Sequence, residues 1–106
     1  MKPVFEDGIA AIRSTTDYAA LRAKLRRTLT RLRETQGEGR ELAIRGFEAT
    51  LRGVQARIDF VENDRGNIEA ATRDAKRADR GLREGARLLR AAGEQLGVEV
   101  GALNGY

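Results

Sequence analysis

Cysteine, histidine and tryptophan are absent from this 106-residue sequence, which contains one proline and five aromatic residues. A disulfide, a Cys/His zinc site, a thiol nucleophile and an imidazole base are therefore excluded. Phosphate-binding motifs such as the P-loop and GxGxxG are also missing. Paired acids such as Asp59 and Glu62 have a spacing that is common on solvated helices. We predict a protein that is not an enzyme and that takes no metal ion, cofactor or small-molecule substrate.

Long apolar segments are absent as well. No run approaches the roughly 18–20 apolar residues that cross a membrane. The N-terminal segment has Glu6 and Asp7 where a signal peptide would have its apolar core. We therefore expect a cytoplasmic protein without a membrane segment.

The residues that are abundant favour helices. Alanine, arginine and leucine dominate, and all three have high helix propensity. Arginine outnumbers lysine by 17 to 3, and the net charge is +4. With so few large side chains, one chain of this length would have a thin core. We therefore expect close helix packing and a homo-oligomer, with a dimer as the predicted state.

The first two helices follow from apolar spacing. A short N-terminal helix is predicted over 3–13, because one of its sides is apolar: Phe5, Ile9 and Ile12. Residues 14–17 then read as a break that supplies an N-cap. The next helix, about 16–36, has an apolar face made by Tyr18, Leu21, Leu25, Leu29 and Leu32. Gly37 can end it.

The second half of the chain predicts two more helices, at about 40–64 and 67–96. In the former, spacings of three and four alternate along a coiled-coil-type seam: Ile44, Phe47, Leu51, Val54, Ile58 and Val61. The latter alternates large and small apolar residues in a similar seam from Ile68 to Leu96. Turn residues over 63–67 favour a break. A single helix over 40–96 is the alternative, because one glycine costs only about 1 kcal/mol in a helix.

Together these patterns predict an all-α protein, an antiparallel, coiled-coil-like helical bundle of one short and three longer helices. Residues 1–97 form its single domain. Residues 98–106 are predicted to be a flexible or loosely packed tail, because glycine disfavours a helix there. Val98, Val100 or Leu103 could lie against the bundle.

A second stripe of small and apolar residues lies opposite the seam of helix 40–64: Leu42, Gly46, Ala49, Gly53, Ala56 and Phe60. Apolar character on two sides is typical of a central helix, and glycine lets another helix approach closely. Two occupants fit this groove. One is segment 3–13 of the same chain, and the other is a second subunit or a partner protein. We therefore treat the six residues as candidate interface residues.

The helix at 18–33 is cationic and contains no acid. Its six basic residues are candidates for binding phosphate or an acidic partner: Arg22, Lys24, Arg26, Arg27, Arg31 and Arg33. Residues 34–64 carry a net charge of −3, so charge pairing between the two helices is the other interpretation. The last helix has a basic side too, interpreted as a solvated, salt-bridged face: Lys76, Arg80, Arg83, Arg87 and Arg90.

Two functions are consistent with these features. The first is a non-enzymatic protein–protein interaction or assembly role, of the adaptor, scaffold or inhibitor type, exerted through helix faces by a homo-oligomer. The second is nucleic-acid binding through the arginine-rich helix 18–33. The sequence lacks the interleaved aromatics and glycine-rich loops of RNA-binding modules, so such binding would be electrostatic.

Overall fold

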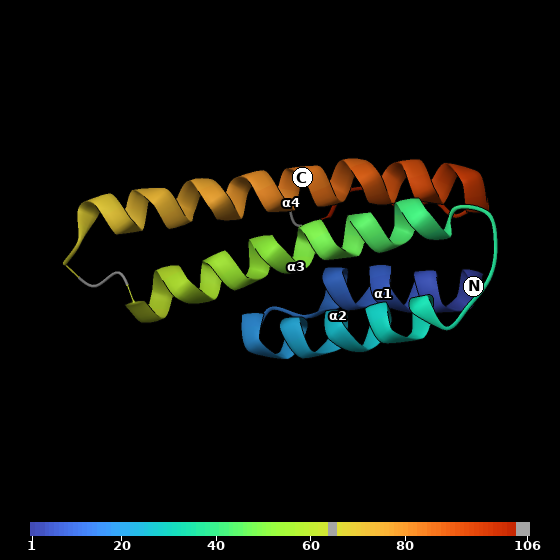
Figure 1. Cartoon of the computed structure of the whole chain (residues 1–106), viewed down its shortest axis with the longest axis horizontal. Helices are drawn as coiled ribbons and strands as arrows, with labels where there is room; N and C mark the ends of the chain where they lie inside the picture. Colours follow the sequence, from blue (N-terminus) through green and yellow to red (C-terminus); the bar gives the residue numbers. More distant parts are fainter. Residues whose placement is uncertain (64–65, 104–106) are drawn as a thin grey trace.

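Four α-helices make up the fold within the residues that the computed structural model describes, 1–63 and 66–103. They are α1 (Lys2–Ser14), α2 (Tyr18–Arg33), α3 (Arg40–Asn63) and α4 (Ile68–Leu96) (Figure 1). These ranges contain no β-strand, and the predicted all-α class is confirmed. No described helix combines the length with the apolar character that a membrane span requires.

The longest helices, α3 and α4, form an antiparallel hairpin, and α1 and α2 lie along one side of it (Figure 1). The two shorter helices cover the part of the hairpin where α3 begins and α4 ends. The opposite end of the hairpin, near Asn63 and Ile68, extends beyond them. The molecule measures 46 Å along its longest axis and 21 Å along each of the other two. It is therefore an elongated bundle whose hairpin is partly covered.

Local signals set the helix boundaries. The Asp17 carboxylate accepts hydrogen bonds from the backbone N–H groups of Ala19 and Ala20, which caps α2. Asn67 caps α4 by accepting from the N–H of Ala70. Gly66, at a φ of +75°, precedes this cap, so 40–96 is two helices rather than one. Asp64 and Arg65 of the predicted turn lie outside the described residues.

The end of α2 differs from the sequence prediction. The helix stops at Arg33, three residues before the expected end at 36. Arg40, at the start of α3, donates hydrogen bonds to the carbonyls of Leu32 and Arg33 at 3.1 and 3.0 Å. A guanidinium group from the next helix thus satisfies carbonyls that a further turn would have used.

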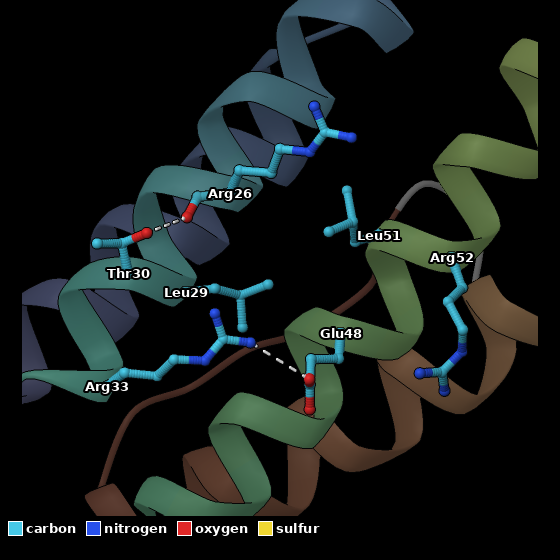
Figure 2. A pocket seen from close by; sticks show the side chains of 7 residues that line it. All are labelled: Arg26, Leu29, Thr30, Arg33, Glu48, Leu51 and Arg52. Carbon is cyan, nitrogen blue, oxygen red and sulfur yellow. Dashed lines mark hydrogen bonds and ion pairs between the residues drawn. The ribbon is translucent and has the colours of Figure 1, made fainter.

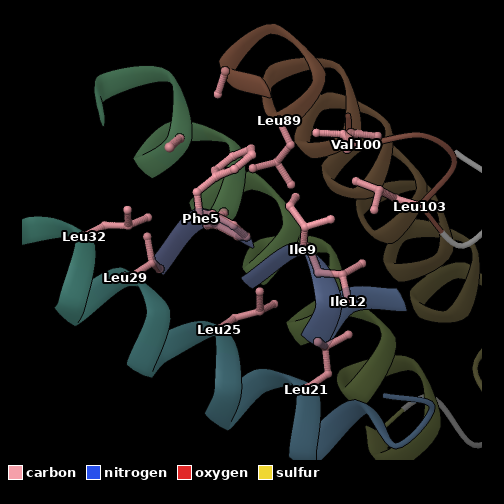
Figure 3. Packing of buried hydrophobic residues seen from close by; sticks show 14 of the residues in the cluster. Phe5, Ile9, Ile12, Leu21, Leu25, Leu29, Leu32, Leu89, Val100 and Leu103 are labelled. Carbon is pink, nitrogen blue, oxygen red and sulfur yellow. The ribbon is translucent and has the colours of Figure 1, made fainter. Parts of the chain in front are cut away.

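The apolar side of α1 completes the core. Figure 3 shows how its residues Phe5, Ile9 and Ile12 lie between four leucines of α2 and Leu89 of α4. The buried rings of Phe5 and Phe47 meet edge to face, with their centroids 5.8 Å apart. All four helices therefore contribute to one continuous core within a single chain.

The helices α3 and α4 approach each other through glycine. A Cβ atom added at Gly81 would lie 2.7 Å from the Gly53 nitrogen and 2.8 Å from the Ala49 oxygen. One added at Gly53 would lie 2.8 Å from the Leu82 nitrogen. At Gly85, an added Cβ would collide with the Thr50 hydroxyl. The two backbones are therefore in direct contact, and this contact fixes the register of the hairpin.

The segment that follows α4 packs against the helical bundle. Gly97, at a φ of +71°, reverses the chain, and the Val98 N–H donates to the Gly93 carbonyl at 2.9 Å. Val100 and Leu103 are buried and belong to the core. Val100 and Leu103 thus lie against the bundle, an arrangement that the sequence allowed for within the predicted tail 98–106.

Replacing Gly81 with alanine should separate α3 from α4. Alanine favours an ordinary helix position over glycine, but here its methyl group must displace backbone atoms of α3. We expect a loss of about 1–3 kcal/mol in the free energy of unfolding, measured by urea denaturation followed by circular dichroism. The control is Ala23→Leu on the exposed side of α2, which should change stability little. A Gly81→Ala variant as stable as the parent would refute the close backbone contact.

Candidate functional site

The predicted interface stripe of α3 is occupied by α4 of the same chain. Gly46, Ala49, Gly53 and Ala56 are buried, and an added Cβ at Gly46 would meet Leu89. Over these four residues, the stripe therefore packs against α4. Neither of the two occupants expected from the sequence, segment 3–13 and a second chain, covers it there. The sequence showed that a helix could approach closely but not which one. Its end residues differ: Leu42 is half-buried, and Phe60 is 40% exposed.

The basic residues of α2 divide between several partners. Arg22 donates to Gln55 of α3 at 3.0 Å, and Lys24 donates to Thr15 at 3.0 Å. Arg31 forms an ion pair with Asp7 of α1 at 3.4 Å. The cationic helix is thus not one uniform binding surface, because part of its charge is used to hold α1 and the loop before α2.

The expected charge match between α2 and α3 is limited among the described residues to one ion pair. Arg33 Nη2 lies 3.4 Å from Glu48 Oε2, and both side chains are about half exposed. An exposed pair of this kind contributes little, about 0–1 kcal/mol. Apolar packing rather than charge therefore joins α2 to α3.

A cleft of about 340 Å³ opens between α2 and α3 (Figure 2). Leu29 and Leu51 provide its apolar surface. Arg26 and Arg33 of α2 border it, and Arg52 of α3 also lines it, with its guanidinium group extending toward α4 (Figure 2). The cleft therefore combines a small apolar floor with a cationic rim.

A second cleft, of about 280 Å³, lies between α3 and α4 and shares Arg52 with the first. Arg77 and Arg80 of α4 line it. The two clefts join arginines of three helices into one surface, which we call the cationic face: Arg26, Arg33, Arg52, Arg77 and Arg80. A third hollow, on α4, shares Arg77 and Arg80 and adds Arg73 and Lys76.

Much of this charge is not neutralised. Arg33 pairs with Glu48, and Arg77 pairs with two carboxylates. Within the part of the chain that the structure describes, none of the ion pairs involves Arg26, Arg52 or Arg80. The acids lining the two clefts are Glu48 and Glu84. The face thus presents three arginines that can receive an anionic ligand.

A chain of polar contacts links three helices and includes two residues that line the second cleft, Gln55 and Arg77. From α2, Arg22 donates to Gln55, whose amide donates to Asp59 at 3.1 Å. Arg77 of α4 then lies 3.8 Å from Asp59 and 2.6 Å from Asp74. Asp74 is 4% exposed. The chain therefore anchors one arginine of the face at a defined position, because a buried carboxylate needs a partner.

Arg52 and Arg77 were not among the site residues predicted from the sequence. Arg52 lies in a segment of net negative charge, and Arg77 lies among alternating acids and bases. Arg80 was predicted to belong to a solvated face, and it does lie on the surface of α4. One sequence signal could have identified the site. Asp74 lies four residues before Ala78, a helical spacing, and is the one acid that continues the small-residue stripe of α4.

The uncovered end of the hairpin exposes apolar side chains. Phe60 is 40% exposed, Val61 is 59% exposed and Ile68 is 83% exposed. Val61 and Ile68 belong to the seams predicted for helices 40–64 and 67–96. They are exposed because α1 and α2 end before this part of the hairpin (Figure 1).

Comparisons of the chain with protein-family models, curated proteins and solved structures gave no match. Within the described residues, no group of three or more acidic side chains is placed to hold a metal ion. The features that bear on function are therefore the geometry and charge of the cationic face and the exposed hairpin end.

Replacing Asp74 with asparagine should destabilise the protein, because the buried contact with Arg77 loses its charge. Hydrogen bonds to charged groups contribute about 1.5–3 kcal/mol, and we expect a loss in that range in urea denaturation. Asp79→Asn is the matched control on the same helix, because its pair with Arg83 is exposed and should contribute less than about 1 kcal/mol. Equal losses in the two variants would contradict the structural role of Asp74.

Proposed function

We propose that this protein is a non-enzymatic helical module that binds a polyanion, a nucleic acid, through the cationic face. The observation that carries the proposal is the convergence of five arginines from three helices around two adjoining clefts. Three of them, Arg26, Arg52 and Arg80, have no ion pair within the described residues. Charges gathered in this way raise the local concentration of an anionic ligand.

Phosphate suits the chemistry of these residues. A guanidinium group is planar and remains charged, and its parallel N–H groups can bind two oxygens of one phosphate. Several arginines spread over a surface fit a ligand that carries many phosphates in a row, because each contact releases counterions from the nucleic acid. Such contacts position a nucleic acid without reading its sequence.

The rigid hairpin supports this proposal. Arg52 stands on α3 one residue before Gly53, and Arg80 stands on α4 one residue before Gly81. The two glycines lie at the close contact between the helices. Arginines held by a fixed backbone lose less conformational freedom on binding than arginines on a mobile loop would.

The pair Arg26→Gln and Arg27→Gln tests the proposal. The two residues are neighbours on α2, but Arg26 lines the first cleft and Arg27 lines none of the clefts described above. We expect the parent protein to bind a short labelled oligonucleotide, with an affinity that falls steeply between about 50 and 200 mM salt. Fluorescence anisotropy should show weaker binding for Arg26→Gln, with a salt slope lower by about 0.9.

The Arg27→Gln variant, which removes the same charge, should bind like the parent. If both variants lose affinity equally, the positive charge of α2 as a whole binds the ligand and the cationic face does not. Absence of binding at about 50 mM salt would end the proposal of nucleic-acid binding.

Self-association is a second candidate function, favoured by the exposed apolar hairpin end. We propose that a second copy of the chain covers Phe60, Val61 and Ile68, which would continue the covering that α1 and α2 give to the rest of the hairpin. A two-fold axis would bring the same patch of each copy together. This would supply the homo-oligomeric state and the assembly role expected from the sequence.

Val61→Asp should shift the protein toward the monomer, because two such ends would then bring buried negative charges together. Sedimentation velocity over a range of concentrations measures the change, with Ala23→Asp on the exposed side of α2 as the charge-matched control. A parent protein that sediments as a monomer at every concentration would exclude self-association through this end.

A further inference from the structure

We infer that the nucleic acid bound by the cationic face is RNA, and that Glu84 recognises it by accepting a hydrogen bond from a ribose 2′-hydroxyl group. The inference rests on the proposed function and specifies the ligand of the same site. Two observations carry it. Glu84 lines a cleft whose other charged residues are arginines, and none of the ion pairs among the described residues involves Glu84.

The cleft between α3 and α4 gathers cations from two helices around this carboxylate. Arg77 and Arg80 line it from α4, and Arg52 of α3 lines it with its guanidinium group extending toward α4 (Figure 2). Glu84 follows Arg80 by four residues, which is about 6 Å along the helix axis. The cleft therefore offers a cation for a phosphate and an acceptor for a hydroxyl group on neighbouring turns of one helix.

Glu84 is the side-chain acceptor that this cleft leaves for a ligand. Gln55, the other lining residue with a side-chain acceptor, already accepts from Arg22 at 3.0 Å through its carbonyl oxygen. The acid of the first cleft, Glu48, is paired with Arg33. A ligand that enters the second cleft thus meets a carboxylate that no ion pair within the described residues engages.

A carboxylate in this position distinguishes RNA from DNA. It repels the phosphates of either strand, and this repulsion lowers the affinity unless the ligand offers a donor in return. Each ribose carries a 2′-hydroxyl group that can donate, whereas deoxyribose has none. The hydroxyl lies on the carbon next to the one that bears the 3′-phosphate. One nucleotide of RNA can therefore place its phosphate at Arg80 and its hydroxyl group at Glu84.

The surroundings of the cleft are held in place, which suits recognition of a group as small as a hydroxyl. The amide of Gln55 donates to Asp59 at 3.1 Å, and Arg77 donates to the buried Asp74 at 2.6 Å. Gly81, which also lines the cleft, lies at the close contact between α3 and α4. Groups on rigid helices keep a fixed geometry, so the loss of one ligand hydroxyl leaves their acceptor unsatisfied.

The test compares three labelled single strands of one sequence by fluorescence anisotropy at about 50 mM salt. The first is RNA, the second is its 2′-deoxy form with uracil retained, and the third is its 2′-O-methyl form, which has no donor at that position. We expect the RNA to bind about tenfold more tightly than the other two, because a hydrogen bond to a charged group is among the stronger ones.

Two single variants locate the preference. Glu84→Ala removes the acceptor, and we expect it to bind the deoxy strand more tightly and the RNA no more tightly, so that the preference for RNA disappears. Glu94→Ala is the charge-matched control, an exposed residue of α4 that lines neither cleft nor the hollow on α4. It should keep the preference of the parent. Circular dichroism verifies that both variants are folded.

The outcomes separate this inference from the proposed function. Equal binding of RNA and the deoxy strand by the parent, or a preference for RNA that survives in Glu84→Ala, would overturn the inference and leave nucleic-acid binding in place. A 2′-O-methyl strand that binds as tightly as RNA would do the same, because the hydroxyl would then not be the donor. If no strand binds the parent at low salt, the proposed function fails and the inference fails with it.

Discussion

Where α3 and α4 meet at Gly53 and Gly81, a single added methyl group would lie within 3 Å of the opposing backbone. Such an approach is possible only for glycine, and it brings main-chain atoms into van der Waals contact along the hairpin. Because the contact needs no large side chains, a chain with five aromatic residues can still form a tightly packed pair of helices. The positions of Arg52 and Arg80, each next to one of these glycines, follow from the same contact.

Most of the secondary structure could be predicted from the sequence, because its signals are local. Asp17 and Asn67 cap the helices as their types suggest, and Gly66 lies within the turn predicted over 63–67. The end of α2 was misplaced, because the carbonyls there are satisfied by Arg40. Because Arg40 belongs to the next helix, the apolar pattern of α2 contains no signal for the position at which α2 ends.

The candidate site was less accessible to sequence reasoning, because it depends on which helices are neighbours. The small-residue stripe of α3 indicated a close approach, but α4, α1 and a second chain could each have provided the other surface. Likewise, the net charge of α2 could be counted from the sequence, but the partner of each basic residue could not be predicted. Asp7 and Thr15, which bind Arg31 and Lys24, belong to a part of the chain that folds back on α2.

The glycine contact also means that the packing of α3 against α4 does not depend on the charged residues of the surface. Gly46, Gly53, Gly81 and Gly85 hold α3 against α4 without any charged side chain. Among the described ion pairs of the cationic face, the one that ties an arginine to a buried carboxylate is that of Arg77. Substitutions elsewhere on the face can therefore accumulate or revert at little cost to folding. In evolutionary terms, the charge pattern of such a surface can drift while the backbone stays the same.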